Sequence, residues 1–176
     1  MTGILITKWI GLEGTVRLVS EKEQELLERF PAAFLKQCRA LEAQLSTVRE
    51  RGIAEAFPCV IREVADGGIF AALWELAEEQ HTGLTVALEK LPVRQETIEV
   101  CEFFGLDPYV LPGGGSLLIA SEAGEGLAQA LTEAGVPVFT AGYFTEGNQR
   151  VVTHGDGVRF LTRPRPDEGD KVKDNA

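Results

Sequence analysis

The sequence predicts an α/β domain built on a mixed, largely antiparallel sheet. Short β-rich apolar segments are interleaved with amphipathic helices, but they do not follow a regular βαβ repeat. Near the C-terminus, strand-like segments at 150–153 and 158–161 flank the turn sequence His154-Gly155-Asp156-Gly157, which is typical of a hairpin. We therefore expect about six strands, with antiparallel pairing introduced by this hairpin.

Length and composition are those of one globular domain. The chain has 176 residues, of which 44% are hydrophobic and 25% charged. The net charge of −10 argues against nucleic acid or an anionic membrane as the main partner. No apolar run is long enough to span a membrane, and the N-terminus lacks the pattern of a signal peptide. The widely spaced Cys38, Cys59 and Cys101 favour free thiols in the cytoplasm.

The first third of the chain is expected to form one strand and three helices. The apolar residues 3–10 predict the strand. Ser20 predicts the N-cap of the first helix, because Glu23 completes a capping box. Pro31 opens the second helix, and residues 48–57 predict a short third one. The apolar stripe of the second helix consists of Phe34, Leu35, Cys38, Leu41 and Leu45.

The middle of the chain alternates between strands and helices. Residues 59–61 predict a strand that leads into a turn at 66–68. The helix after this turn has an apolar face at helical spacing, made of Ile69, Leu73, Leu76 and Ala77. Leu84, Val86 and Leu88 alternate as in a half-buried strand, and residues 94–104 predict another helix.

The last third completes the sheet. A strand is expected at 116–120, a helix at 123–134 and a strand at 136–144, before the hairpin. After Thr162 the chain is rich in proline, glycine and charged residues, which favours fraying. We therefore predict one domain over 1–164 and a disordered tail over 165–176.

The turn Asp66-Gly67-Gly68 is the first candidate ligand contact. Two glycines at a helix start let backbone N–H groups approach a ligand, and the helix dipole favours an anion such as phosphate there. The alternative is structural, because Asp66 is a good helix cap and the two glycines supply a bend.

Two further glycine-containing segments fit the same picture. Gly113, Gly114, Gly115 and Ser116 predict a second cradle of backbone amides, or else a flexible loop before a strand. A second set is expected either to line the same cleft or to allow close packing next to a strand: Gly11, Glu13 and Gly14.

Other polar and aromatic residues give less specific signals. Lys8 is expected to meet a phosphate or to be solvated, and Glu63 to reach a metal or a substrate hydroxyl, or to be an exposed carboxylate. Trp9 and Trp74 suit a core or a domain interface. No Ser/His/Asp or Cys/His arrangement indicates a nucleophile. We therefore assign no catalytic residue and no metal ligand.

Three segments together resemble the C-terminal domain of the aminoimidazole ribonucleotide (AIR) synthase superfamily. They are residues 4–15, residues 62–69 and residues 107–116. Within that superfamily the chain is most similar to the hydrogenase maturation factors that dehydrate a carbamoyl group, and to AIR-synthase-related proteins. The resemblance extends from Ile4 to Pro164.

The resemblance implies a three-layer α/β/α domain. Full-length relatives are ATP-dependent, and their N-terminal domain carries magnesium-binding acidic residues and the dimer interface. ATP lies near the junction of the two halves, so no cofactor is expected for this chain alone. The implied partners are an ATP-binding N-terminal domain, a homodimer partner and a metallocentre-assembly protein.

The sequence departs from the family pattern in three places. It starts just before the first strand of the C-terminal domain, and it lacks the terminal cysteine that carries the carbamoyl group in the dehydratases. Ala65 and Asp66 stand where relatives often have Thr and Arg. The first hypothesis is therefore the C-terminal domain of an ATP-dependent enzyme, inactive alone. The second is a non-catalytic binding or assembly module that uses the same surface for a protein partner.

Overall fold

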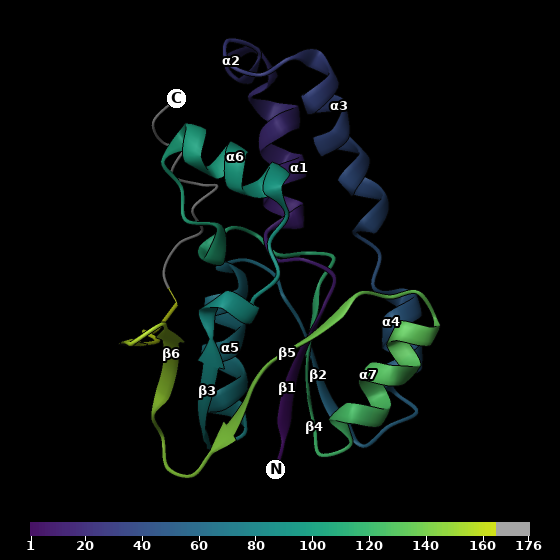
Figure 1. Ribbon diagram of the computed structural model, residues 1–176, viewed down its shortest axis with the longest axis vertical. Coiled ribbons are helices and arrows are strands. Elements are labelled where there is room, and N and C mark those ends of the chain that lie inside the picture. The colour runs from purple at the N-terminus through teal and green to yellow at the C-terminus, as the bar shows by residue number, and fades with distance from the viewer. Residues whose placement is uncertain (165–176) are drawn as a thin grey trace.

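The computed structural model describes residues 1–164 and places seven strands in one sheet (Figure 1). The tail predicted at 165–176 lies outside the described residues. The strands are β1 (Gly3–Thr7), β2 (Cys59–Glu63), β3 (Gly83–Ala87), β4 (Leu117–Ser121), β5 (Val138–Thr145), β6 (Arg150–His154) and β7 (Gly157–Phe160). The α-helices are α1 (Leu12–Glu21), α2 (Glu23–Leu27), α3 (Ala32–Ala40), α4 (Val48–Ala54), α5 (Gly68–Glu79), α6 (Gln95–Phe104) and α7 (Gly124–Glu133). Short 3₁₀ turns are η1 (Leu41–Gln44), η2 (Leu88–Lys90) and η3 (Pro108–Val110).

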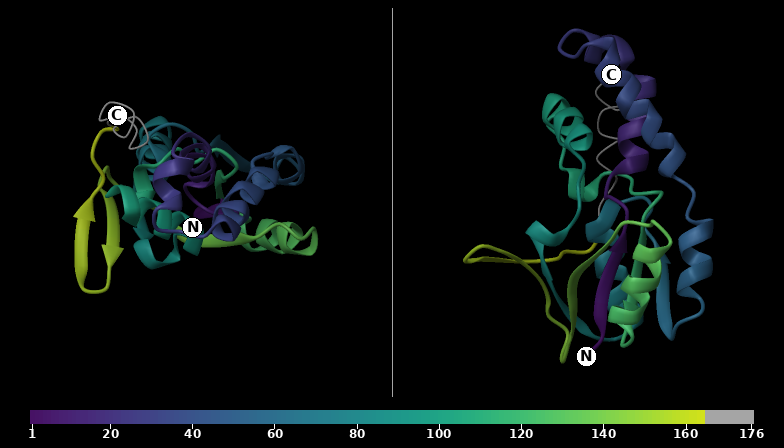
Figure 2. Two further views of the ribbon diagram at one scale, coloured as in Figure 1. Left: turned by 90° about the horizontal axis from the view of Figure 1, so that it is seen from above. Right: turned by 45° about the vertical axis from the view of Figure 1, so that its right-hand side comes forward.

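The sheet is mixed and largely antiparallel, as the sequence predicts. Its strand order is β2-β4-β1-β5-β3-β6-β7. Five neighbouring pairs are antiparallel, and only β3 and β6 run parallel. The predicted C-terminal hairpin is confirmed as β6 and β7, and it projects from the body of the molecule (Figure 2).

Helices pack on both faces of the sheet, which confirms the three-layer α/β/α arrangement. Because side chains alternate between faces along a strand, Ile4 and Ile6 of β1 pack in one core with α5. Leu5, between them, packs in a second core with Leu127 and Leu131 of α7. Helix α4 joins this second core, so α5 covers one face while α4 and α7 cover the other.

A third hydrophobic core lies beyond one end of the sheet. The helices α1, α2, α3 and α6 gather there, away from α4 and α7 (Figure 1). Their buried side chains include Leu18, Leu26, Leu35 and Val100. This helical group adds a separately packed unit to the three layers.

Three local predictions were wrong. Ser20 is not an N-cap, because α1 begins at Leu12 and Ser20 lies inside it. The first strand ends at Thr7 rather than at residue 10, and Leu88 belongs to η2 rather than to β3. The helix starts early because Gly11 adopts a left-handed conformation (φ 68°) and redirects the chain at once.

Candidate functional site

The three glycine-containing segments meet beside the end of the sheet where the helical group begins. Leu111 is the residue that joins them. A Cβ atom on Gly14 would lie 2.2 Å from its Cγ atom, and one on Gly68 would lie 2.6 Å from its carbonyl oxygen. Gly11 faces the same side chain, with Leu111 Cδ2 3.4 Å from an added Cβ. These glycines therefore allow close packing between the segments.

Backbone hydrogen bonds fix the same junction. Gly14 N donates to the carbonyl of Pro112 at 2.9 Å. Gly68 N and Gly113 N both donate to the carbonyl of Ala65, at 3.1 and 3.2 Å. Several of the amides that the sequence suggests for phosphate binding thus already have acceptors within the chain.

Glu13 connects two of the predicted site segments directly. Its Oε2 atom accepts a hydrogen bond from Gly114 N at 3.1 Å. Its Oε1 atom accepts from Arg17 at 2.9 Å, one turn further along α1. The carboxylate of Glu13 therefore occupies the position at which an anion would meet the Gly114 amide.

A cavity of about 260 Å³ opens next to this contact. Its lining consists of Glu13, Leu45, Thr47, Glu63, Val64, Gly114, Gly115 and Ser116. Of the ten predicted site residues, the structure brings four into this lining. The other six lie in the packed junction or at its surface: Gly11, Gly14, Asp66, Gly67, Gly68 and Gly113.

The polar groups at the cavity are carboxylates and hydroxyls. Glu63 is exposed at the end of β2, where it accepts a hydrogen bond from Thr47 Oγ1 at 3.0 Å. Arg51 lies 3.3 Å from the same carboxylate oxygen. Ser116 is buried, and its hydroxyl donates to the carbonyl of Thr7 at 2.7 Å, so it ties β4 to β1. Both carboxylates at the cavity are thus paired with an arginine, Glu13 with Arg17 and Glu63 with Arg51.

Asp66 does not cap α5. The N-cap position is Gly67, which adopts a left-handed conformation with φ 83°, and no side chain makes a capping hydrogen bond there. Gly68 follows with φ 70° and packs against the carbonyls of Tyr109 and Leu111. Asp66 itself is exposed. Close packing therefore explains Gly68, the left-handed N-cap position explains Gly67, and Asp66 lies exposed beside the site.

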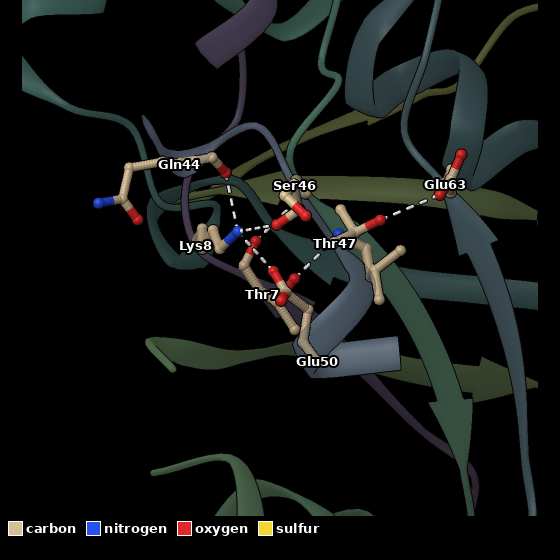
Figure 3. A network of polar contacts seen from close by, with 9 residues as sticks. Thr7, Lys8, Gln44, Ser46, Thr47, Glu50 and Glu63 are labelled. Atoms are coloured by element: carbon tan, nitrogen blue, oxygen red, sulfur yellow. Dashed lines mark hydrogen bonds and ion pairs between the residues drawn. The ribbon is translucent and has the colours of Figure 1, made fainter. Parts of the chain in front are cut away.

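Lys8 has a role that neither of its two expected environments, a phosphate or solvent, includes. Its ammonium donates to the carbonyls of Gln44 and Ser46, at 2.8 and 2.6 Å, and lies 2.5 Å from a carboxylate oxygen of Glu50 (Figure 3). Lys8 thus neither faces a phosphate nor extends into solvent. It holds the segment 44–50, which supplies Leu45 to the cavity lining.

The described part of the chain shows no metal cluster and buries two of its three cysteines. Within residues 1–164, no group of three or more His, Cys, Asp or Glu side chains could hold a metal ion. Cys38 and Cys101 are buried, and burial raises the pKa of the Cys38 thiol to about 11. A thiol with so high a pKa is a poor nucleophile near neutral pH. None of the helices among these residues is long and apolar enough to cross a membrane.

The two tryptophans lie half-buried under arginine side chains. The guanidinium of Arg94 lies 4.8 Å from the ring centroid of Trp9. The guanidinium of Arg150 lies 4.9 Å from that of Trp74 on α5. Both rings are therefore covered by cation–π contacts within the domain.

Together, these features define an α/β domain with a mixed sheet, in which three glycine segments and a polar cavity share one end. Residues 4–155 match the family described as AIR synthase related protein, C-terminal domain, and the chain belongs to this family. The resemblance drawn from the three sequence segments is confirmed.

Curated relatives include enzymes of hydrogenase maturation. Carbamoyl dehydratase HypE of Rhodobacter capsulatus is 34% identical over 101 residues, which are 57% of this chain and 29% of that protein. Carbamoyl dehydratase HypE of Rhizobium leguminosarum bv. viciae is 32% identical over 130 residues, which are 73% of this chain and 35% of that protein. The chain thus spans about a third of the length of these relatives.

Solved structures share the fold at lower identity. E. coli HypE superposes with a TM-score of 0.75 and 21% identity, over 95% of this chain and 51% of its own. HypE crystallised in complex with ATP gives 0.70 and 21%, over 96% and 52%. A HypE–HypF complex gives 0.68 and 21%, over 93% and 53%. This chain therefore corresponds to about half of each solved chain.

Proposed function

We propose that this chain is the C-terminal half of an ATP-dependent, AIR-synthase-type enzyme related to hydrogenase maturation factors. It supplies substrate-facing loops to a site that an ATP-binding domain completes, and it does not turn over ATP alone. The observation that carries this proposal is the family match over residues 4–155. The chain corresponds to about half of each matched HypE structure, and one of those structures was crystallised with ATP.

The cavity beside Gly114 is the part of the site that this half contributes. Glu13 already accepts the hydrogen bond of the Gly114 amide, so this amide is not available to a phosphate. The carboxylates of Glu13 and Glu63, with the hydroxyl of Thr47, suit a substrate hydroxyl or amino group. We therefore assign the substrate's neutral or basic end to the cavity and the ATP phosphates to the other half.

The remaining predicted residues have a supporting part in this proposal. Asp66 is exposed beside the junction and is available to a substrate or to the facing domain. Gly11, Gly14, Gly68 and Gly113 allow the segments beside the cavity to pack closely, and Gly67 is the left-handed N-cap of α5. Their contribution is to the shape of the site rather than to direct contacts.

The test uses ATP and magnesium with the chain alone and with a separately produced N-terminal half of R. capsulatus carbamoyl dehydratase HypE. We expect no ATP hydrolysis by the chain alone, a stable complex with the other half, and hydrolysis by that complex. Glu63→Gln is expected to lower kcat/KM for the substrate that enters the cavity about 10-fold or more, without weakening the complex. The matched control is Glu28→Gln, at an exposed site in the helical group. ATP hydrolysis or tight ATP binding by the chain alone would contradict the proposal.

A second candidate is a non-catalytic binding or assembly module. One observation favours it: the amides of Gly68, Gly113 and Gly114 already donate within the chain, which leaves fewer for a ligand's phosphate. A HypE–HypF complex is among the solved structures that share the fold, which supports this candidate. Binding of a maturation protein by this chain without any ATP-binding half would favour this candidate over the first.

A further inference from the structure

A groove lies on the surface of the helical group, between α3 and α6, beyond the end of the sheet (Figure 1). It encloses about 440 Å³ and shares no lining residue with the cavity beside Gly114. One wall comes from α3 and the residues just before it, and the other from the first half of α6. The walls include Phe30, Phe34 and Gln37 on the α3 side, and Gln95, Glu96 and Glu99 on the α6 side.

The lining residues of each wall form a row. Phe34 and Gln37 of α3 are three residues apart, as are Glu96 and Glu99 of α6, and this spacing places both members of a pair on one face of a helix. Phe30, just before α3, continues the first row because its ring stacks on that of Phe34, with the centroids 4.6 Å apart. Each helix therefore presents a continuous row of side chains to the groove.

The two rows run in opposite directions. At one end, the ring centroid of Phe30 lies 6.0 Å from that of Phe103, in the last turn of α6. At the other end, Cys38 lies near the end of α3, and burial, followed by the nearby Glu96 carboxylate, raises the pKa of its thiol to about 11. The groove therefore changes along its length from aromatic, at Phe30, to acidic, at Glu96.

The aromatic end offers an apolar surface that is partly exposed. Phe30 and Phe34 are both half-buried, and their ring planes are inclined by 26°. The guanidinium of Arg29 lies 5.6 Å from the centroid of the Phe30 ring. Because a cation already lies over this ring, the aromatic end suits an apolar side chain better than a second cation.

The acidic end offers a carboxylate without a basic partner. Glu96 is paired with Arg94, whose Nε atom lies 3.1 Å from Oε2 of Glu96. Glu99 accepts a hydrogen bond from the side-chain amide of Gln95 at 2.9 Å. Among residues 1–164, no ion pair engages Glu99. Glu99 is therefore the group to which a lysine or an arginine of a partner is attracted.

We propose that this groove binds a basic amphipathic helix of a partner protein. A third helix fits the groove between two packed helices, because its side chains interdigitate with both rows. Its apolar side chains contact the pair of Phe30 and Phe34, and its lysine or arginine, a turn or two away, meets Glu99. The site is separate from the proposed function, since neither ATP nor the cavity beside Gly114 takes part in it.

Apolar contact and charge have different roles at this site. An ion pair at a partly exposed carboxylate contributes little affinity by itself. Burial of apolar side chains against the aromatic pair supplies most of the affinity, whereas Glu99 selects among partners. A helix with an acidic residue at this place is disfavoured by Glu99 and by the net charge of −10 of the whole chain.

The test titrates the isotopically labelled full chain with a synthetic peptide and follows the amide chemical shifts by NMR. The probe is an alanine-based helical peptide of about 15 residues, with two leucines one turn apart and one arginine a turn further on. We expect saturable shifts in the amides of α3 and α6. The Kd should be about 5-fold lower than for the same peptide with glutamate in place of arginine. Replacing both leucines by serine should abolish saturable binding.

A charge reversal in the groove tests the role of Glu99. Glu99→Lys is expected to reverse the preference, so that the glutamate peptide binds about 5-fold more tightly than the arginine peptide. Glu102→Lys is the matched control, because Glu102 is exposed on the same helix, lies outside the groove lining and changes the net charge equally. It should leave the preference for arginine intact. Circular dichroism and thermal melting establish that both variants are folded.

Four outcomes would overturn the proposal. The first is the absence of saturable shifts on α3 and α6. The second is an equal effect of the two lysine variants, which would show attraction to the overall charge alone. The third is displacement of the peptide by the separately produced N-terminal half of R. capsulatus HypE, which would assign the groove to the contact between the two halves. The fourth is a dimer in sedimentation that Glu99→Lys dissociates, which would assign it to a second copy. The proposed function is unaffected by the first two outcomes, because the probe needs neither ATP nor the other half.

Discussion

At the scale of single residues, the pair of Lys8 and Glu50 shows how one buried contact holds the wall of the candidate site. Both side chains are almost fully buried, and Lys8 also bonds two carbonyls of the segment 44–46. Lys8 itself adopts a left-handed backbone conformation, with φ 58°, at the end of β1. Surrounding contacts must hold a lysine in this conformation, because it is unfavourable for residues other than glycine.

Lys8→Met is expected to lower the free energy of unfolding by about 3–5 kcal/mol, because it leaves the Glu50 carboxylate buried without its partner. Urea unfolding followed by circular dichroism measures this loss. The double variant Lys8→Met with Glu50→Leu should lose less than the sum of the single variants. Lys90→Met, at an exposed position, is the control and should change stability by less than about 0.5 kcal/mol. Additive losses would contradict the buried pair.

The sequence offered no local signal for this pair. Gln44 and Ser46 follow Lys8 by 36 and 38 residues, and Glu50 lies in a helix of its own. Patterns within one element reveal which face is apolar, but not which distant segments meet. The site was predicted in part for the same reason: its glycines were visible in the sequence, while the acceptors of their amides were not.

At the scale of elements, left-handed glycines immediately precede the helices α1 and α5 and fix where they begin. Most predicted strands and the helices α5, α6 and α7 agree with the structure, because their apolar spacing matches one buried face. Helix α1 was missed over residues 12–19, because Gly11 and Gly14 suggested a loop and the predicted helix begins only at Ser20. The structure shows Gly14 inside the helix, where Leu111 fills the space that a side chain would take.

Gly68→Ala is expected to destabilise the domain by at least ~2 kcal/mol. Its φ of 70° is unfavourable for alanine, and the added methyl would lie 2.6 Å from two carbonyl oxygens. Gly52→Ala is the matched control within α4, where nothing lies within 4 Å of the added methyl. That change should stabilise by about 0.5–1 kcal/mol. Thermal melting measures both, and equal effects of the two changes would refute the packed junction.

The buried thiol on α3 predicts a loss of stability at high pH. The pKa of Cys38 is raised from 9.0 to about 11, chiefly by burial. The folded state therefore holds this proton more tightly than the unfolded state. The stability that the protonated Cys38 thiol contributes is complete below pH 9 and is lost as the pH rises from 9 to about 11. Urea unfolding between pH 8 and 11 should show a smaller decline for Cys38→Ala than for the wild type.

Thiol labelling gives an independent check of the same burial. Iodoacetamide at pH 8 should modify the half-buried Cys59 and spare Cys38 until urea unfolds the domain. Mass spectrometry of the peptides distinguishes the two sites. Rapid modification of Cys38 in the native protein would show that the helical group opens readily or that the thiol is not buried.

At the scale of the whole molecule, the separate cores imply separate stabilities. The sheet shares its strands between two cores, so β1 and β4 are held from both faces. The helical group has a core of its own, and Leu111 is its buried contact with the glycine junction. Units that share few contacts can open independently of one another. The helical group should therefore open before the sheet does.

Native-state hydrogen exchange in low urea tests this division. The amides of α2 and α3 are expected to exchange through an opening at least ~1 kcal/mol below the global free energy, with a smaller urea dependence. The amides of β1 and β4 should exchange only by global unfolding. Leu35→Ala, in the helical core, should lower both free energies by about 2–4 kcal/mol and leave the gap between them unchanged, because the helical group is unfolded in both openings. Leu127→Ala, in the core under α7, should lower only the free energy of global unfolding. If all amides converge on one free energy and one urea slope, the domain unfolds as a single unit, and the helical group is bound to the sheet more tightly than its separate core implies.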